Sequence, residues 1–413
     1  MYQFISDLMF YVIKPIASLS MKRRGYTQDS IDRKCGFIPE NGFTKDDNVI
    51  MFHGVSVGEA VALENLVKAA RKEFKDSKIV VTTGTHTGQD IAKKKLGETA
   101  DLITYFPADF PKCIRRFLDK VNPKTVFIAE TEIWPNFAME CKKRGIKLYI
   151  INGRISDSTF KSYNALKLIF KYFLSFYTGI FTQSDDDNKK FLTLGANPET
   201  TKKMGNLKFD VKKPDGVKFN KDGARVILAG STHQGEDKIV LDVFKRLKEK
   251  YSDLKLILAP RHLTRTDEVK GLISEYGFNF DLRSNNRDNL DGIEILQLDT
   301  LGELGKMYEH ADISFIGGSF NKTGGHNPLE SIVWDKPVLS GPSTHNFKDI
   351  YNIIKKAHAG FVVNSEEEFF EIADKMLSDR EFYDETVASG TRVFAEQQGA
   401  LDFVINVLKT NCL

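Results

Sequence analysis

A repeated alternation of short β-rich runs with helical patterns constrains the fold of this chain most strongly. In the first half, the β-rich runs are Val49–Phe52, Lys78–Thr82, Leu102–Tyr105, Thr125–Ala129 and Lys147–Ile151. In the second half, they are Arg225–Ala229, Lys255–Ala259, Glu294–Leu298, Ile313–Ile316 and Pro337–Leu339. Such alternation predicts parallel strands joined by helices. We therefore expect an α/β protein with two doubly wound, Rossmann-like domains.

The alternation pauses at a polar stretch, 209–223, which we interpret as a linker. Because 413 residues exceed what one hydrophobic core usually supports, two domains are expected. The predicted organisation is an N-terminal segment at 1–40, a first domain at 41–208 and a second at 224–413. The last helical pattern, Ala400–Leu408, is a candidate to pack back across the domain junction. Doubly wound sheets bind ligands beyond the carboxyl ends of their strands, so a cleft between the domains is the expected site.

Composition limits the classes of partner. The 59 Lys and Arg residues nearly balance the 56 Asp and Glu residues, which gives no general argument for nucleic-acid binding, and none is predicted. The cysteines are scattered, without metal-ligand or redox spacing, at Cys35, Cys113, Cys141 and Cys412. A reduced, cytoplasmic setting fits this pattern best.

Two segments are candidates for a membrane surface. The apolar run Leu8–Ile13 ends at Lys14, well short of the ~20 residues that a membrane span needs. A basic cluster, 22–24, follows it, which favours a helix lying on an anionic membrane. A helix packed on the protein's own core is the alternative. For the second segment, 160–181, rich in aromatic residues and lysine, we prefer a buried helix followed by a strand.

A glycine-rich segment, Gly317–Glu330, follows the apolar run Ile313–Ile316 and predicts a strand, a turn and a helix start. Glycines let backbone N–H groups approach a ligand, and the N-terminal end of the new helix attracts negative charge. Glu330, one turn into the helix, is positioned to accept hydrogen bonds from hydroxyls. The pattern indicates phosphate and ribose as ligands, whereas a helix that merely begins after a flexible loop is the structural alternative.

Carboxylates follow two strand ends in the first half. Glu59 falls in the first turn after Ser56-Val57-Gly58, where it is either a general base or an ordinary helix-start residue. Glu130 and Glu132 flank Thr131 before Trp134-Pro135, a pattern that fits substrate binding or a helix start with Pro135 in its first turn.

Polar residues also follow two strands in the second half. The segment 229–236 carries Ser231 and Thr232, whose hydroxyls and backbone N–H groups suit a phosphate. Arg261 stands at the end of the next strand and suits phosphate or carboxylate. None of the four strand ends has the Gly-Lys-Ser/Thr ending of a P-loop, a Gly-x-Ser-x-Gly nucleophile elbow or metal-ligand spacing.

Taken together, these motifs resemble those of the Kdo transferases, the 3-deoxy-D-manno-octulosonic acid (Kdo) transferases of lipopolysaccharide assembly. The resemblance covers almost the whole chain and rests on Ser56–Glu59, Glu130–Asn136, Gly205–Asp210, Ser231–His233, Pro260–His262, Gly317–Glu330 and Asn346–Asp349. It implies a GT-B glycosyltransferase fold, with two Rossmann-like domains facing a cleft. It also implies a first domain that binds the acceptor and a second that binds CMP-Kdo.

The resemblance implies a chemistry and a location as well. The donor is CMP-Kdo, the acceptor is a lipid A precursor (lipid IVA), the anomeric carbon is inverted, and no metal or other cofactor takes part. The enzyme is expected at the cytoplasmic face of the bacterial inner membrane, as a peripheral or monotopic protein on an anionic surface.

Site roles follow from the same match. Glu59 corresponds to the catalytic base, and Glu130 is expected to position donor or acceptor. Arg154 and Lys208 are candidates for the Kdo carboxylate or for acceptor phosphates. The residues implied to hold CMP, the last two of them near its ribose, are Ser231, Thr232, Arg261, Gly317, Gly318, Asn327 and Glu330.

Two other functions stay open at this stage. A nucleotide-sugar epimerase of the same two-domain architecture would turn over a UDP-sugar without an acceptor. A non-catalytic nucleotide-binding module on a membrane surface would bind CMP without making product, although the pair of carboxylates Glu59 and Glu130 argues against it.

Overall fold

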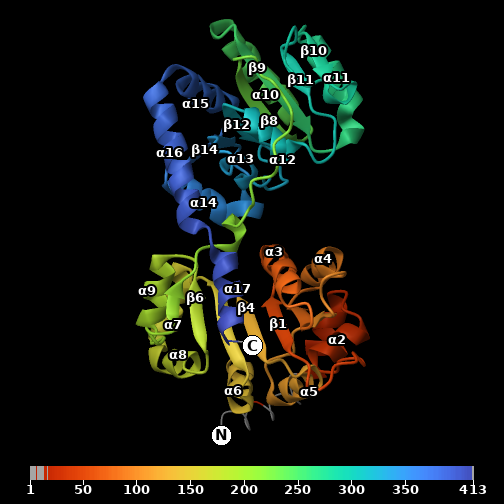
Figure 1. The fold of residues 1–413 in the computed structure, drawn as a ribbon, viewed down its shortest axis with the longest axis vertical. Coiled ribbons are helices and arrows are strands. Elements are labelled where there is room, and N and C mark those ends of the chain that lie inside the picture. The colour runs from red at the N-terminus through yellow and green to blue at the C-terminus, as the bar shows by residue number, and fades with distance from the viewer. Residues whose placement is uncertain (1–5, 7–13, 16, 412–413) are drawn as a thin grey trace. The chain divides into compact units, whose positions relative to one another are not determined.

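The computed structural model describes residues 6, 14–15 and 17–411. The chain forms two compact units (Figure 1): unit 1 comprises Met1–Asp210 with Gln397–Leu413, and unit 2 comprises Val211–Glu396. Their placement relative to each other is not determined, so each is described by itself, and the cleft expected between them stays a prediction. The apolar run Leu8–Ile13 lies outside the described residues.

Unit 1 is built on a parallel seven-stranded sheet with the strand order β3-β2-β1-β4-β5-β6-β7. Its strands are β1 Val49–Gly54, β2 Lys78–Thr83, β3 Leu102–Tyr105, β4 Thr125–Ala129, β5 Lys147–Gly153, β6 Gly179–Thr182 and β7 Thr201–Lys203. Its helices are α2 Gln28–Lys34, α3 Val57–Glu73, α4 His86–Leu96, α5 Pro111–Val121, α6 Pro135–Arg144, α7 Asp157–Ala165, α8 Lys167–Leu174, α9 Asp185–Thr193, η1 Leu207–Phe209 and α17 Ala400–Asn411. The strand order reverses between β1 and β4, the position at which doubly wound sheets bind ligands.

The central strands of unit 1 are buried on both faces. Successive side chains of a strand point to opposite faces, so Val49 and Met51 pack against α5 and α6. Ile50 and Phe52 pack on the other face, against α3 and α4. This two-sided burial explains why these segments read as near-continuous apolar runs in the sequence.

Unit 2 repeats the architecture with the order β10-β11-β9-β8-β12-β13-β14, again all parallel. Its strands are β8 Arg225–Thr232, β9 Leu254–Pro260, β10 Phe280–Leu282, β11 Ile295–Gln297, β12 Ile313–Ile316, β13 Val338–Ser340 and β14 Gly360–Val362. Its helices are α10 Glu236–Lys250, η2 Leu263–Arg265, α11 Thr266–Glu275, η3 Arg283–Asn285, α12 Leu304–Met307, η4 Tyr308–His310, α13 Leu329–Ile332, η5 His345–Phe347, α14 Lys348–Lys356, α15 Glu366–Ser378 and α16 Arg380–Gln397. The strand order of unit 2 reverses between β8 and β12, as it does between β1 and β4 in unit 1.

The predicted domain boundaries need one correction. Residues 397–413, assigned above to a second domain at 224–413, belong to unit 1, in agreement with the expectation that Ala400–Leu408 packs back across the domain junction. The division between the units lies between Asp210 and Val211. Helix α17 buries Ala400, Val404, Ile405 and Leu408 in the core beside α3. The Asp210 carboxylate accepts hydrogen bonds from the backbone N–H groups of Gly399 (2.7 Å) and Leu401 (2.6 Å) and so caps α17.

A second correction concerns 160–181, for which a buried helix was preferred. The segment forms two helices, of which α7 has no buried residue and α8 buries only Leu174. The strand expected after them is present as β6. In the part of the chain that the structure describes, no helix is both long enough and apolar enough to cross a membrane.

Candidate functional site

Unit 1 gathers three carboxylates where its strand order reverses. Glu59 lies in the first turn of α3, which follows β1, and Glu130 comes directly after β4. Glu132 lies in the turn between β4 and α6. The charge of Glu130 raises the pKa of Glu59, and the charges of Glu59 and Glu130 raise the pKa of Glu132. Because β1 and β4 are neighbours in the sheet, the fold brings together residues that are 71 positions apart in the sequence.

Glu59 caps its own helix. Its Oε2 accepts a hydrogen bond from Val55 N (2.6 Å), its Oε1 accepts one from Ser56 Oγ (2.7 Å), and Ser56 Oγ accepts one from Glu59 N (3.4 Å). This is a variant of the capping box. Burial raises the pKa of the Glu59 carboxyl, and the nearby charge of Glu130 raises it further. An ionised carboxylate offers about four lone-pair sites, so these two bonds leave Glu59 able to accept a further proton.

Glu130 binds the two cations that were expected to meet substrate anions. Arg154 Nε donates to Glu130 Oε2 over 3.0 Å, and Lys208 Nζ lies 3.7 Å from Glu130 Oε1. The backbone of Glu130 has a φ of 61°, in the left-handed region that non-glycine residues rarely occupy. Thr131 Oγ1 donates to the Arg154 carbonyl, which ties the end of β4 to the end of β5. Arg154 and Lys208 therefore each form an ion pair with Glu130 in the structure.

Lys208 is held by a buried amide network. Asn206 Nδ2 donates to Gln183 Oε1 (3.2 Å), and Gln183 Nε2 donates to the Asn152 carbonyl (3.1 Å). Asn152 Oδ1 in turn accepts the Leu207 N–H (3.0 Å). These bonds hold η1 against the ends of β5 and β6. They give the polar residue Asn206, just before Lys208, a structural role.

Glu132 is a site residue to which the sequence analysis gave no separate role. Burial raises the pKa of its carboxyl to about 7, and the charges of Glu59 and Glu130 add to that rise. The sequence shows Glu132 in the motif Glu130-Thr131-Glu132. Its closeness to Glu59 arises only in the fold, because β1 and β4 are neighbouring strands. Near neutral pH, Glu132 therefore exchanges a proton in a cluster that also holds the predicted base.

Unit 2 places its predicted residues at the ends of three adjacent strands. Ser231 is near the end of β8, Arg261 follows β9, and Gly317 follows β12. Ser231 has a φ of 56°, and its carbonyl oxygen would lie 2.4 Å from a Cβ built on Gly317. The close approach of these two backbones requires glycine at position 317.

The backbone N–H groups from Gly317 to Phe320 have partners within the protein, so contact of Gly317 and Gly318 with CMP stays a prediction. Gly317 N donates to the Gly230 carbonyl (2.8 Å). The buried carboxylate of Glu236 accepts hydrogen bonds from Gly318 N (2.6 Å), Ser319 N (2.7 Å) and Phe320 N (2.8 Å). It also accepts one from His233 N (2.9 Å). Glu236 is thus the internal anion that shapes this loop.

Two other residues expected to hold CMP also have internal partners. Thr232 is fully buried, and its Oγ1 donates to Asp237 Oδ1 over 2.6 Å. Asn327 Oδ1 accepts the Leu329 N–H over 3.1 Å at the start of α13. Both side chains therefore shape the loops behind the strand ends. Direct contact of Thr232 or Asn327 with a nucleotide stays a prediction.

Arg261 faces a cluster that the sequence analysis did not assemble. His233 Nε2 and His326 Nε2 lie 2.9 Å apart, and their rings are stacked. Burial, assisted by the positive charge of Arg261, lowers the pKa of His326 to about 4, so the imidazole is neutral at physiological pH. Burial raises the pKa of Glu330, and Arg261 opposes that rise. At the carboxyl ends of these strands, an exposed guanidinium, two imidazoles and a carboxylate suit a phosphate with nearby hydroxyls.

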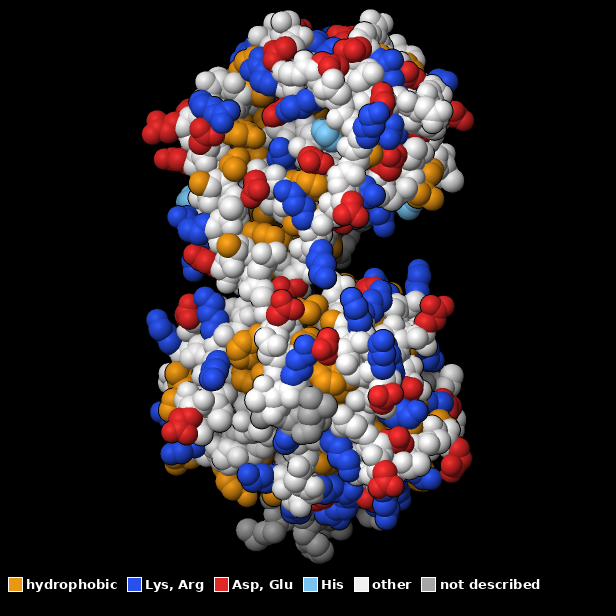
Figure 2. Space-filling view, in the orientation of Figure 1, with side chains coloured by type: hydrophobic (Ala, Val, Ile, Leu, Met, Phe, Trp, Pro, Cys, Tyr) orange, Lys and Arg blue, Asp and Glu red, His pale blue; other side chains and the backbone are white. Residues whose placement is uncertain are grey.

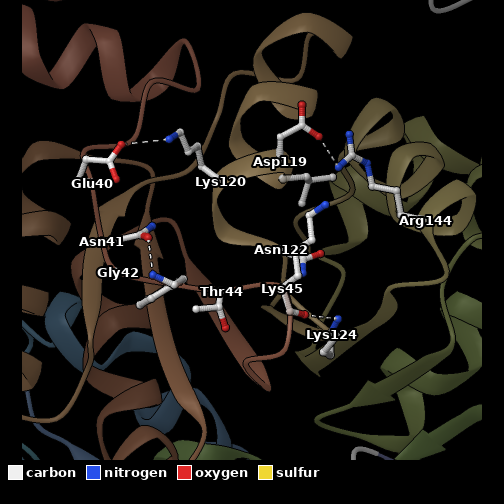
Figure 3. Close-up of a pocket in the computed structure, with 12 residues that line it drawn as sticks. Glu40, Asn41, Gly42, Thr44, Lys45, Asp119, Lys120, Asn122, Lys124 and Arg144 are labelled. Carbon is white, nitrogen blue, oxygen red and sulfur yellow. Dashed lines mark hydrogen bonds and ion pairs between the residues drawn. The ribbon is translucent and has the colours of Figure 1, made fainter.

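The pocket in Figure 3 lies elsewhere in unit 1. It is lined by residues that precede β1 and β4, including Lys45 and Lys124, at the amino ends of the strands. Four of its charged side chains form ion pairs within it, Lys120 with Glu40 and Arg144 with Asp119. Three predicted site residues of the first half, Glu59, Glu130 and Arg154, follow the carboxyl ends of strands at the opposite end of the sheet. The fourth, Lys208, lies in η1.

Comparisons with known proteins agree with the resemblance seen in the sequence motifs. Residues 29–211 match the family model described as 3-Deoxy-D-manno-octulosonic-acid transferase (kdotransferase). A 3-deoxy-D-manno-octulosonic acid transferase of Haemophilus influenzae is 32% identical, over 99% of this chain and 98% of its own. One of Aquifex aeolicus is 30% identical, over 83% of this chain and 90% of its own.

Among solved structures, a UDP-GlcNAc 2-epimerase of Neisseria meningitidis bound to UDP-GlcNAc has a TM-score of 0.52 and 14% identity, covering 88% of this chain and all of that one. That likeness concerns the fold alone. The two doubly wound units, each with polar side chains at its strand ends, have the GT-B type of fold. On the similarity to the Haemophilus influenzae relative, the chain belongs to the 3-deoxy-D-manno-octulosonic acid transferase family.

Proposed function

We propose that this enzyme transfers Kdo from CMP-Kdo to a lipid A precursor, lipid IVA, with inversion at the anomeric carbon. Family membership supports the transferred group. The observation that carries the chemistry is the carboxylate of Glu59, buried where the strand order of unit 1 reverses and raised in pKa by burial and by Glu130. A raised pKa suits a carboxylate that accepts a proton during the reaction.

In the proposed step, a hydroxyl oxygen of the acceptor attacks the anomeric carbon of Kdo. The bond between that carbon and the phosphate oxygen of CMP breaks, and its electron pair leaves with CMP. The hydroxyl proton passes to Glu59. A single displacement of this kind inverts the anomeric centre and needs one proton acceptor and one stabiliser for the leaving phosphate.

For unit 2, we propose that Arg261 and the Ser231 hydroxyl bind the CMP phosphate and that Glu330 accepts hydrogen bonds from the ribose hydroxyls. The exposed guanidinium of Arg261 supports the first role, and the carboxylate of Glu330 beside it supports the second. Thr232, Gly317, Gly318 and Asn327 act as supports for these groups. In unit 1, Arg154 and Lys208 bind the Kdo carboxylate or an acceptor phosphate, and Glu130 positions both cations.

We further propose that the enzyme works at the cytoplasmic face of the inner membrane and needs no metal ion. Charge stabilisation of the departing phosphate would then come from Arg261. Transfer rates measured with excess EDTA and without it should agree within about twofold, whereas a metal that stabilises the leaving group is worth several kcal/mol. Loss of transfer in EDTA, restored by a divalent cation, would contradict metal independence.

The experiment that tests the function is the release of CMP. We expect purified enzyme to release CMP from CMP-Kdo only when detergent-dispersed lipid IVA is present, and Arg261→Gln to raise the donor KM about tenfold or more. Arg392→Gln, on the exposed face of α16, is the matched control and should behave as wild type. Turnover of UDP-GlcNAc without an acceptor, in place of CMP release, would point to an epimerase.

A further inference from the structure

Helix α8 presents an uncovered apolar surface. Four large side chains in or next to it are exposed: Leu166 by 53%, Leu168 by 83%, Ile169 by 49% and Tyr172 by 55%. We call these four residues the α8 face. Figure 1 shows α7 and α8 beside β6, and Figure 2, in the same orientation, shows orange apolar side chains at the surface of this part of unit 1.

The α8 face is contiguous. Leu168 and Tyr172 are four residues apart and therefore lie on one side of the helix, with Ile169 next to them. Single exposed apolar residues are normal on a protein, but a contiguous set marks an interaction site. Aromatic rings in and next to the face contact one another: the ring centroids of Tyr163 and Phe170 lie 3.9 Å apart in a stack, and those of Tyr172 and Phe176 lie 4.9 Å apart, edge-on.

The segment that carries the face has charges of one sign. From Ser158 to Ser184 the sequence contains no Asp or Glu and three lysines. All three lysines, Lys161, Lys167 and Lys171, are exposed. Lys167 and Lys171 are four residues apart and lie along one flank of the α8 face. An apolar stripe bordered by lysines is complementary to a bilayer with anionic headgroups, because the side chains enter the acyl boundary while the ammonium groups meet the phosphates.

We propose that the α8 face docks on an anionic lipid bilayer and brings unit 1 to the membrane that carries its acceptor. The inference builds on the proposed function, since a lipid acceptor resides in that membrane. It is independent of Leu8–Ile13, and it assigns a contact with lipid to α8, the helix that the sequence analysis expected to be buried.

Vesicle sedimentation with the full chain tests the proposal. We expect wild type to bind vesicles containing phosphatidylglycerol more strongly than vesicles of phosphatidylcholine alone. Leu168→Glu should weaken binding to the anionic vesicles at least about tenfold, because it removes a buried apolar contact and adds a repelled charge. Lys167→Gln with Lys171→Gln should weaken it about fivefold per lysine. Leu301→Glu is the matched control, since Leu301 is 84% exposed in unit 2.

The outcomes separate the docking surface from the proposed function. Transfer to detergent-dispersed acceptor should be the same for Leu168→Glu and wild type, while transfer to vesicle-embedded acceptor should fall. If wild type transfers Kdo in detergent but Leu168→Glu binds vesicles as wild type does, the docking proposal is wrong and the transferase stands. A dimer of wild type in solution that Leu168→Glu dissociates would also overturn it, because a second copy would then cover the face.

Discussion

Ser56 and Glu59 bind each other at the first turn of α3: Ser56 Oγ donates to Glu59 Oε1 over 2.7 Å, and Glu59 N donates to Ser56 Oγ over 3.4 Å. The same carboxylate lies close enough to Glu130 for that charge to raise its pKa. Glu59 thus has a structural task, capping α3, and a position suited to accepting a proton. Variants of the two residues can separate these roles.

The first prediction concerns Glu59→Gln. Glutamine keeps the size of the side chain and one carbonyl oxygen but cannot accept the acceptor's proton. We expect kcat to fall by about 10²–10⁴, the usual contribution of a general base, while CMP binding measured by calorimetry stays unchanged. Wild-type turnover by this variant would remove Glu59 from the base role.

Ser56→Ala is the matched test of the structural role. It removes the hydroxyl from the cap but leaves the bond from Val55 N to Glu59 Oε2, which measures 2.6 Å. Loss of a serine cap costs about 1 kcal/mol of stability, so the variant should unfold at lower urea while its kcat stays within about threefold of wild type. If Ser56→Ala lost as much turnover as Glu59→Gln, the effect of Glu59 would be one of helix capping.

Glu236→Gln should disrupt the glycine loop of unit 2. The carboxylate accepts hydrogen bonds from Gly318, Ser319, Phe320 and His233, and an amide replaces one accepting oxygen with a donor. Each N–H left buried without a partner costs about 1–3 kcal/mol. We expect CMP affinity to fall about tenfold or more by calorimetry, and to stay unchanged in the control Glu275→Gln, at an exposed position of α11. Equal affinities in both variants would contradict the role of Glu236.

The pKa of Glu132 predicts a pH dependence of stability. In the folded protein this carboxyl has a pKa of about 7, against 4.5 for an ordinary glutamate. Between these values the folded chain keeps a proton that the unfolded chain has released, so stability falls as pH rises from about 4.5 to 7. Glu132→Gln is neutral at every pH and should lose this part of the dependence.

Thermal unfolding of wild type and Glu132→Gln at pH 5 and pH 8 measures this effect. At pH 8 the variant avoids the cost of burying an ionised carboxylate and its repulsion by Glu59 and Glu130. It should gain about 2–4 °C for each kcal/mol relieved, and little at pH 5. Glu40→Gln serves as control, because the Glu40 side chain is 94% exposed. A shift of the same size at both pH values would mean that Glu132 does not titrate in this range.

The strands that sequence patterns predicted are those buried on both faces. β3, β4 and β12 were predicted with their observed bounds, since they are mostly apolar, buried runs between turn residues. β7, β10 and β14 were not predicted. Each is an edge strand of three residues with at most one of them buried, whereas β11 and β13, equally short but fully buried, were predicted. The exposed α8 was missed because an aromatic-rich helix looks the same in the sequence whether it is covered or not.

For the candidate site, the places of the residues at strand ends could be predicted, but their hydrogen-bond and ion-pair partners could not. Glu59, Glu130, Ser231, Arg261 and Gly317 were identified because parallel strands end at one edge of a sheet. The partner of the Gly318 N–H group could not be predicted, because Glu236 lies in the first turn of α10, 82 residues earlier. The pairing of Arg154 and Lys208 with Glu130 likewise depends on contacts between β4, β5 and η1 that no local pattern reveals.

Mass spectrometry of the lipid product tests the central claim most directly. Purified enzyme would be incubated with freshly generated CMP-Kdo and a tetraacylated lipid A precursor, beside an active Kdo transferase as a positive control. We predict that the lipid gains the mass of one or more Kdo residues, and that Glu59→Gln gives little or none. An unmodified lipid alongside a modified control would contradict the transferase activity with this acceptor.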